Sequence, residues 1–389
     1  NMKTILQILP SLDKINGGVE RGTLDVAREL SKRKYNSVII SSGGEMADRY
    51  KYKGVSHHKI DINKKGLINF LSSRGKFRKL LDQIKPDLVH VRSRWPSFCF
   101  TSEIKKRKIP YVTTYHGTYS GNKNFLKKSY NKVMTYGDKI ISISKFIDDH
   151  IRHFFPEVKN KLVQINRGID TKNFDLSSVS QIRKEKILSE LSIPERSHII
   201  LLPGRLSSWK GQIIGIDALD YVLKKNPPQN IVMLLVGSED KKDSFTKKIK
   251  KRLERLKLTD RVIFCGNISD MATVYSISDI VLSTSIEPEA FGRISAEASS
   301  MTKPVIASNH GGSREIIENN LSGWLVNPGD PEALGEKILH VLNLEQEKKD
   351  LIGSNARKRI IQKFNLKQML DKTINVYEEL IEAKENFGN

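Results

Sequence analysis

The segment 285–297 combines acidic residues, an arginine and a glycine at a spacing that suits recognition of a phosphorylated sugar. It follows the apolar run 279–283, and the pattern predicts that a helix begins near Gly292. The first backbone N–H groups of a helix have no partner within the helix and can bind phosphate. Glu289 precedes this helix and Glu297 lies inside it, and carboxylates accept hydrogen bonds from vicinal hydroxyls. We expect a nucleotide-sugar site here, with a capping or ion-pair role as the alternative for Glu297.

Two basic residues follow another apolar run, 198–203. Arg205 comes two residues after this run, and Lys210 stands five residues further on, between a predicted strand and a predicted helix. An arginine can hold a phosphate through two nitrogens, and a lysine adds a second positive charge. The pair can therefore neutralise one anionic group; the alternative is two solvated surface charges.

Paired glycines, Gly17 and Gly18, follow the first apolar run, 3–9, and precede a helical pattern. Glycines at a helix start let backbone N–H groups approach an anion, and the helix dipole favours the negative charge. The pattern is not the Gly-x-Gly-x-x-Gly fingerprint, which argues against a nicotinamide cofactor. An ordinary turn is the alternative.

Short apolar runs alternate with segments of helical spacing along the chain, which indicates parallel sheets covered by helices. We expect an α/β fold with two doubly wound, Rossmann-like domains facing across a cleft, and ligand-binding loops at the carboxyl ends of the strands. The predicted strands lie at 3–9, 37–41, 87–91, 110–114, 138–143 and 161–165, and then at 198–203, 230–236, 261–265, 279–283, 304–308 and 323–326.

The predicted domain boundaries follow from the same pattern. Residues 1–170 form the first domain, the polar stretch 171–196 is a linker, and 197–364 form the second domain. The end of the chain is helical, and we expect the last helix, 365–386, to pack back on the first domain.

Composition limits the classes of protein to which the chain can belong. Its 389 residues suffice for about two domains, and no stretch approaches the ~18 apolar residues of a membrane span. The two cysteines, Cys99 and Cys265, lie far apart, which argues against a disulfide framework or zinc site and favours a reducing compartment. We therefore expect a cytoplasmic protein.

Taken together, these motifs resemble the family 4 retaining glycosyltransferases of the GT-B fold, which transfer a sugar from a nucleotide-sugar donor. The resemblance spans the whole chain. It rests on Glu289-x7-Glu297 with Phe291-Gly292 between, Gly204-Arg205 with Lys210-Gly211, Gly17-Gly18, Tyr115-His116-Gly117, Val262-x-Phe264-x-Gly266, and Gly311-Gly312 with Glu315.

The resemblance implies a role for each matching residue. Glu289 would bind the transferred sugar and His116 would lie near it, so these two are the candidate catalytic residues. Arg205 and Lys210 would neutralise the donor diphosphate, and Glu297 would hold the ribose. The remaining implied donor contacts are made by Gly17 and Gly18, by the backbone of Gly266, Asn267 and Ile268 toward the base, and by the backbone N–H groups of Phe291, Gly292 and Arg293.

The resemblance also implies that neither a metal nor another cofactor is needed, since Arg205, Lys210 and a helix N-terminus take the place of a divalent cation. No Asp-x-Asp motif is evident. Three positions depart from the common pattern: Arg167 before Gly168, Arg92 where histidine is frequent, and Thr302 before Lys303. They leave the subgroup open.

The expected activity is transfer of a hexose or N-acetylhexosamine, most simply from a UDP-linked donor, to a lipid-linked or polysaccharide acceptor of a bacterial surface glycan such as lipopolysaccharide or capsule. A sugar-nucleotide epimerase of similar architecture is the enzymatic alternative. A basic nucleic-acid-binding protein is the other, but no nucleic-acid module is present and we expect no such partner.

Positive charge is concentrated in the first half of the chain. Residues 1–180 carry 35 Lys and Arg against 16 Asp and Glu, whereas residues 181–389 carry 31 against 28. An excess of positive charge in one half of the chain indicates an anionic partner. We expect peripheral binding to an anionic membrane surface. The alternative is that these charges form a solvated helix face. Three clusters stand out: Arg74/Lys76/Arg78/Lys79, Lys105/Lys106/Arg107/Lys108 and Lys123/Lys127/Lys128/Lys132.

Overall fold

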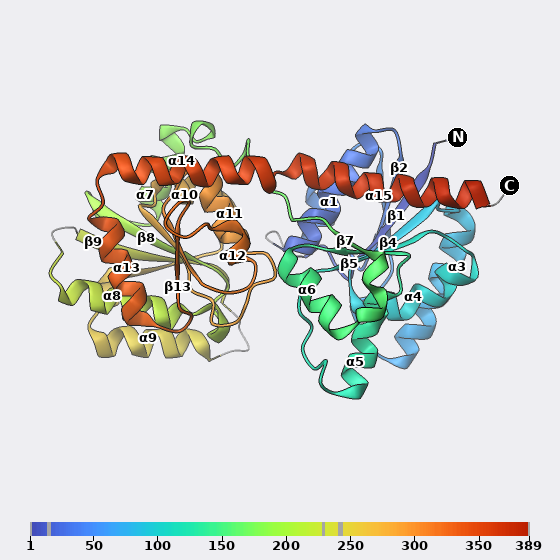
Figure 1. The fold of residues 1–389 in the computed structure, drawn as a ribbon, viewed down its shortest axis with the longest axis horizontal. Coiled ribbons are helices and arrows are strands. Elements are labelled where there is room, and N and C mark those ends of the chain that lie inside the picture. Colours follow the sequence, from blue (N-terminus) through green and yellow to red (C-terminus); the bar gives the residue numbers. More distant parts are fainter. Residues whose placement is uncertain (1, 14–16, 228–229, 240–243, 388–389) are drawn as a thin grey trace. The chain divides into compact units, whose positions relative to one another are not determined.

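The structure is a computed structural model that describes residues 2–13, 17–227, 230–239 and 244–387 (Figure 1). These residues form two compact units. The first comprises Asn1–Asn166 and Lys367–Asn389, and the second comprises Arg167–Leu366. Each unit is built around one sheet whose strands all run parallel.

The sheet of the first unit has the strand order β3-β2-β1-β4-β5-β6-β7. In this order the chain moves outward in one direction from β1 and then in the other from β4, so the two loops after β1 and β4 diverge at a topological switch point. The strands are β1 (Thr4–Ile8), β2 (Asn36–Ser41), β3 (Val55–Lys59), β4 (Leu88–Val91), β5 (Tyr111–Tyr115), β6 (Lys139–Ser142) and β7 (Leu162–Gln164).

Helices cover this sheet, and their apolar sides form its core with the strands. Leu6 and Ile8 of β1 are fully buried in a cluster that includes Phe77 and Phe100 from two different helices. The helices are α1 (Gly18–Lys32), α2 (Glu45–Arg49), α3 (Leu67–Ile84), α4 (Arg94–Lys106), α5 (Phe125–Asn131), α6 (Lys145–Phe154) and α15 (Leu366–Phe387).

The sheet of the second unit repeats the arrangement with the order β10-β9-β8-β11-β12-β13. Its switch point lies between β8 and β11, which pair directly. Both sheets confirm the predicted doubly wound α/β fold. The strands are β8 (Ser197–Pro203), β9 (Asn230–Val236), β10 (Val262–Gly266), β11 (Ile280–Ser283), β12 (Val305–Ser308) and β13 (Trp324–Val326).

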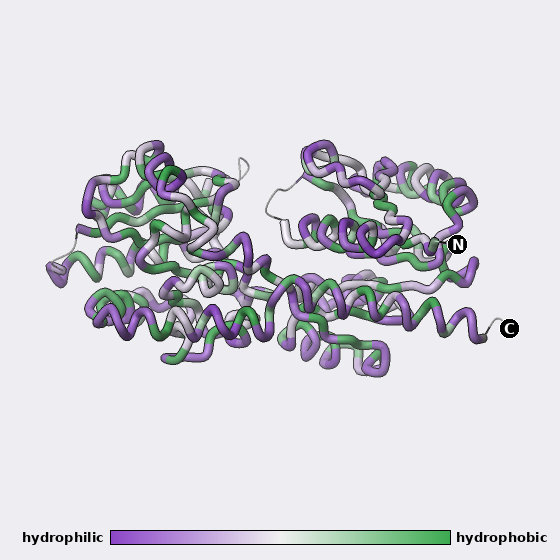
Figure 2. Tube along the Cα trace, turned by 90° about the horizontal axis from the view of Figure 1, so that it is seen from above, coloured by the Kyte–Doolittle hydropathy of each residue, from purple (hydrophilic) through white to green (hydrophobic). Residues whose placement is uncertain are grey.

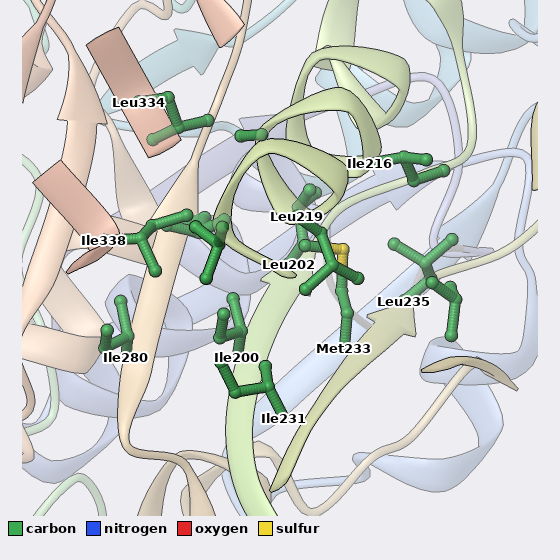
Figure 3. Close-up of a cluster of buried hydrophobic side chains, with 14 of the residues drawn as sticks. Ile200, Leu202, Ile216, Leu219, Ile231, Met233, Leu235, Ile280, Leu334 and Ile338 are labelled. Carbon is green, nitrogen blue, oxygen red and sulfur yellow. The ribbon is translucent and has the colours of Figure 1, made fainter. Parts of the chain in front are cut away.

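The core of the second unit fills the space between its central strands and two helices that pack on them (Figure 3). Leu219 of α8 and Ile338 of α13 are fully buried there, facing Ile200, Met233 and Ile280 of three neighbouring strands. The helices are α7 (Gln181–Glu190), α8 (Gln212–Lys224), α9 (Phe245–Leu256), α10 (Met271–Ile277), α11 (Arg293–Ser300), α12 (Ser313–Ile316), α13 (Pro331–Leu342) and α14 (Gln346–Lys363).

Hydropathy follows this layering. Figure 2 shows hydrophobic runs in the interior of each unit, while the helices alternate between hydrophilic and hydrophobic residues along their length. This alternation is typical of helices that bury one side and expose the other. Among the described residues, no helix is both long enough and apolar enough to cross a membrane.

The predicted linker at 171–196 differs from the structure, which places this stretch inside the second unit. Helix α7 packs against α10, and Arg183 donates to both carboxylate oxygens of Asp270 at 3.0 and 2.6 Å. Only Ile187 of α7 is buried. The helix is therefore attached largely by polar contacts, which explains why its sequence resembles a linker.

The last helix, α15, packs on the first unit through both charged and buried contacts. Arg33 pairs with Asp371, and the Tyr35 hydroxyl donates to Glu378 at 2.6 Å. Tyr377 is fully buried, and its hydroxyl shares a hydrogen bond with Nδ1 of His90 on β4. Burial lowers the pKa of His90 well below its ordinary value, so this imidazole is neutral near pH 7.

Replacing Tyr377 by alanine should lower the free energy of unfolding by about 3–5 kcal/mol, because a large buried ring is lost. Tyr377→Phe should cost less, about 1–3 kcal/mol, because the ring stays and only the contacts of the hydroxyl with the buried His90 and Arg92 are lost. Urea denaturation followed by circular dichroism measures both. Glu379→Ala, on the exposed side of the same helix, is the control, and equal stability of Tyr377→Ala and this control would contradict the packing.

A buried carboxylate on α4, Glu103, holds three arginines. Its Oε1 accepts hydrogen bonds from Arg74 at 2.9 Å and Arg78 at 2.9 Å, and its Oε2 accepts one from Arg107 at 2.8 Å. Burial opposes ionisation of Glu103, but the guanidinium hydrogen bonds outweigh it and lower its pKa to about 2. Two of the three predicted basic clusters are thus partly neutralised inside the first unit.

This cluster predicts a specific dependence of stability on pH. Because the pKa of Glu103 is lower in the folded than in the unfolded protein, its contribution is complete above the unfolded value and is lost as pH falls toward about 2. The stability difference between wild type and Glu103→Gln should therefore be largest near about pH 7 and shrink below about pH 4. Urea midpoints of both proteins across this range test it, and a difference independent of pH would contradict it.

Candidate functional site

The predicted donor-binding residues of the second unit gather at the carboxyl edge of its sheet. The loops after β8, β9 and β10 are joined there by backbone hydrogen bonds: the Gly204 N–H donates to the Val236 carbonyl at 2.8 Å, and the Gly237 N–H to the Gly266 carbonyl at 2.9 Å. The loop after β11, which carries Glu289, lies on the other side of the switch point. Ligands of doubly wound folds bind at this position.

An ion pair links the two loops that diverge at the switch point. Nζ of Lys210 lies 2.7 Å from Oε1 of Glu289, and both side chains are largely buried. The aliphatic part of the Lys210 side chain lies alongside Gly204, and a side chain at position 204 would contact it. Two residues predicted from separate motifs are therefore in direct contact.

Glycine is required at the turn that carries Lys210. Gly211 has φ +74°, and a Cβ there would lie 2.0 Å from the carbonyl oxygen of Thr284. The Thr284 hydroxyl in turn donates to the carbonyls of Lys210 and Gly211. The Ile286 N–H donates to the Trp209 carbonyl at 2.8 Å, so the two loops are bonded through their backbones as well.

Arg205 differs from Lys210 in having its charge available. Among the described residues, no carboxylate or hydrogen-bond acceptor contacts its exposed guanidinium. Its carbonyl accepts a hydrogen bond from Gln212 at 3.0 Å, which holds the backbone of the loop. The arrangement offers a fixed backbone with a cation directed to solvent, as a binding site for an anion needs.

Helix α11 begins in this loop, as predicted. Its N-cap is Gly292, with φ +87°, and a Cβ there would approach Ser313 and Ile316 at 3.1 and 3.2 Å. Within the part of the chain that the structure describes, no acceptor binds the backbone N–H groups of Phe291 and Gly292. Together with Arg293 at the first helical position, these N–H groups can receive phosphate oxygens.

Glu297 lies within α11 and is nearly buried. Its Oε2 accepts a hydrogen bond from the Tyr275 hydroxyl at 2.9 Å, and its Oε1 lies 3.6 Å from the Arg293 guanidinium. Burial and the adjacent Glu297 carboxylate raise the pKa of Tyr275 well above its ordinary value, so the hydroxyl stays protonated and donates. The carboxylate of Glu297 is thereby held in one orientation.

Three supporting residues were not predicted as site residues. Ser285 donates to the same Glu289 oxygen that Lys210 contacts, and Trp209 places its ring 4.3 Å from the Lys210 ammonium. Tyr275 is a third, on α10. Ser285 and Trp209 lie within the predicted motif segments, but their roles, like that of Tyr275, follow from contacts that the sequence pattern does not give.

The loop after β12 packs against the backbone of Glu289. The Gly312 N–H donates to the Glu289 carbonyl at 2.8 Å, and Gly311, with φ +56°, would clash with the same carbonyl if it carried a Cβ. The Gly311-Gly312 motif therefore provides close backbone packing under the candidate catalytic residue.

The residues predicted to meet the base lie at the end of β10. Gly266 has φ +62°, and the pairing of β10 with β9 shifts its register just before it. Gly266 and Asn267 are exposed, and Ile268 is partly so. They thus form an accessible rim on the β10 side of the loop that carries Arg205 and Lys210.

The remaining predicted residues lie in the first unit. Gly17 is the N-cap of α1, after β1, and Gly18 is its first residue. The Gly17 carbonyl accepts the Arg21 N–H at 3.0 Å, and a side chain on Gly17 would meet the Glu20 carboxylate. His116 follows β5. All three lie at the carboxyl edge of the first sheet, where a ligand of this unit is expected.

The side chains of the site suit anions and hydroxyls. Over the described ranges, no group of three or more His, Cys, Asp or Glu residues is placed to hold a metal ion. The chemistry that these side chains offer is neutralisation of an anion by Arg205 and Lys210, and hydrogen bonding to hydroxyls by Glu289 and Glu297.

Comparison with known proteins identifies the family. The family model described as Glycosyl transferases group 1 matches residues 183–359, and the one described as Glycosyltransferase Family 4 matches residues 16–173. A crystal structure of a glycosyltransferase from Rickettsia africae is 35% identical, with a TM-score of 0.87, and the match covers 98% of this chain and 99% of that one.

Two more distant proteins match over nearly their whole length. HepE from Anabaena, solved in complex with UDP and glucose, is 23% identical with a TM-score of 0.83, covering 97% of this chain and 100% of that one. An Escherichia coli UDP-Gal:alpha-D-GlcNAc-diphosphoundecaprenol alpha-1,3-galactosyltransferase is 22% identical, covering 97% of each. The two family models and the 35% identical structure establish that the chain belongs to the family 4 glycosyltransferases of the GT-B fold.

Proposed function

We propose that this glycosyltransferase takes a hexose or N-acetylhexosamine from a UDP-linked donor and transfers it, with retention of anomeric configuration and without a metal, to a lipid-linked or polysaccharide acceptor in surface-glycan synthesis. The observation that carries the proposal is the Lys210–Glu289 ion pair, whose two loops also carry Arg205, a cation without an ion pair among the described residues, and the start of α11. Groups for a diphosphate and for a sugar are thus in contact at one switch point.

The donor diphosphate is the leaving group, and it gains negative charge as the bond to the sugar breaks. Arg205, Lys210 and the N–H groups at the start of α11 are placed to stabilise that charge. They supply the role that a divalent cation has in other transferases. An assay in EDTA tests this. Activity that persists in EDTA supports a metal-independent transferase, whereas activity that is lost in EDTA and restored by a divalent cation would contradict it.

Glu289 is held by Lys210 and Ser285 on one oxygen, Oε1. No described residue donates a hydrogen bond to its other oxygen, which can accept one from a sugar hydroxyl. Glu297, oriented by Tyr275, is suited to a second pair of hydroxyls, those of the ribose. The two carboxylates belong to the same loop–helix segment: Glu297 lies in α11, and Glu289 lies in the preceding loop, which Gly312 and Lys210 hold in place.

The choice of UDP is supported by relatives. HepE was solved with UDP and glucose, and the name of the E. coli relative gives a UDP-galactose donor and a diphosphoundecaprenol-linked acceptor. A lipid diphosphate acceptor also agrees with the basic first half of the chain. A thermal-shift screen against UDP-, GDP- and ADP-sugars tests the donor, since ligand at about 100 times its Kd stabilises by about 2.7 kcal/mol.

Replacing Arg205 by alanine should weaken UDP binding about 10- to 100-fold, because one charge-assisted contact to the diphosphate is lost. Donor hydrolysis or transfer should fall by about 10²–10³. Calorimetric titration with UDP measures the first effect and product formation the second. Lys247→Ala, which removes an exposed charge on α9, is the control; equal UDP affinity in both variants would contradict the assignment.

The two glutamates should give different kinetic phenotypes. Glu297→Gln should raise the KM for donor with little change in kcat, because ribose contacts exist in both ground and transition states. Glu289→Gln should lower kcat as well, because Glu289 holds the reacting sugar. Steady-state kinetics on both variants test this, and the reverse pattern would mean that the two roles are exchanged.

A further inference from the structure

Exposed apolar side chains of the first unit are concentrated on three neighbouring helices. Among its described residues, six of the seven large hydrophobic side chains that are exposed lie on α3, α4 and α5. Phe125 and Ile68 are 83% and 85% exposed. We call these six residues the α3–α5 patch: Leu67, Ile68, Leu71, Phe98, Phe125 and Leu126.

Ring contacts hold the three helices together beneath this patch. Phe98 on α4 lies 5.7 Å from Phe70 of α3 and 6.0 Å from Tyr130 of α5, measured between ring centroids. Lys65, just before α3, places its ammonium 5.6 Å from the Tyr130 ring. Phe98 therefore contacts both α3 and α5, and the residue just before α3 also reaches α5 directly.

The apolar residues are fixed in their exposed positions by the way their helices begin. Asn124 caps α5 by accepting the N–H groups of Leu126 and Lys127 at 3.1 and 3.3 Å. This cap places Phe125 and Leu126 in the first turn, where they bury little. Single exposed apolar residues are ordinary, but a contiguous group rimmed by polar residues marks an interaction site.

The surroundings of the patch are basic. The stretches 62–81 and 118–137 contain six and four Lys or Arg residues, respectively, and no Asp or Glu. Arg74 and Arg78 are engaged by Glu103, but Lys65, Lys123 and Lys127 form no ion pair within the described part of the chain. The charges left over thus lie at the starts of α3 and α5, beside the exposed apolar residues.

We propose that the α3–α5 patch docks this protein on an anionic lipid bilayer, with the six apolar side chains inserted at the interface and the flanking lysines against the headgroups. Apolar burial combined with electrostatic attraction to anionic lipids is how a protein without a membrane span binds an interface reversibly. The inference rests on the proposed lipid-linked acceptor for its purpose, because docking would bring the first unit to the surface where such an acceptor resides.

Flotation of the full chain with vesicles tests this without donor or acceptor. The vesicles are neutral phosphatidylcholine, or the same lipid with about 30% phosphatidylglycerol, in about 0.05 M and about 0.5 M NaCl. We expect binding to the anionic vesicles at low salt, several-fold weaker binding at high salt, and little binding to neutral vesicles.

Two variants and two matched controls locate the surface. Phe125→Ser with Leu126→Ser should weaken binding at least about tenfold, because two apolar side chains no longer insert. Lys123→Glu with Lys127→Glu should weaken it by at least about fivefold per residue. The controls make the same changes on exposed helices of the second unit, at Ile182 with Leu351 and at Lys247 with Lys248, and should bind as wild type does.

Wild type that ignores lipid charge, or patch variants that bind no worse than their controls, would overturn the proposal. A concentration-dependent dimer that the patch variants abolish would also overturn it, since a second copy would then cover the surface. UDP affinity of every variant is measured separately. If vesicle binding fails while UDP binding persists, the docking inference is wrong and the proposed function stands; the converse result rejects the donor assignment alone.

Discussion

Parallel pairing of β8 with β11 is the constraint on which the candidate site depends. Ile200 and Leu201 of β8 pair with Ile280 and Val281 of β11, so the two strands end side by side. The chain leaves β8 toward one edge of the sheet and leaves β11 toward the other, so the loops that follow these two strands diverge at the switch point. Backbone bonds, a glycine with φ +74° and the Lys210–Glu289 ion pair then fix those loops to each other.

The fold could be predicted because buried parallel strands are continuous apolar runs, and all twelve predicted strands are present. The one missed strand, β3, lies at a sheet edge; its Ser56 and His57 are exposed, so it has no such run. The linker prediction differs for the same reason, because α7 is held by an ion pair rather than by an apolar face. The polarity of a segment predicts whether it is buried, but it does not predict which element a polar helix packs against.

The candidate site could be predicted to the level of loops and motif residues, since glycines and charges at strand ends have recognisable spacing. Its supporting contacts could not. Tyr275 reaches Glu297 from 22 residues away, and Lys210 reaches Glu289 across 79. Such pairs follow from strand order, which motifs do not encode. Similarly, Glu103 withdraws Arg74 and Arg78 from the basic surface, whereas the sequence alone counts all three clusters equally.

The return of α15 to the first unit has a consequence for the order in which the protein folds. The second unit is one continuous segment, Arg167–Leu366, whereas the first is interrupted by it. During synthesis, domains generally fold as they emerge, the N-terminal one first. Here Tyr377, which fills the space beside His90, is made after the whole second unit. The half synthesised first is therefore the half completed last, and until then its β4 site for Tyr377 stays open to other apolar partners, including chaperones.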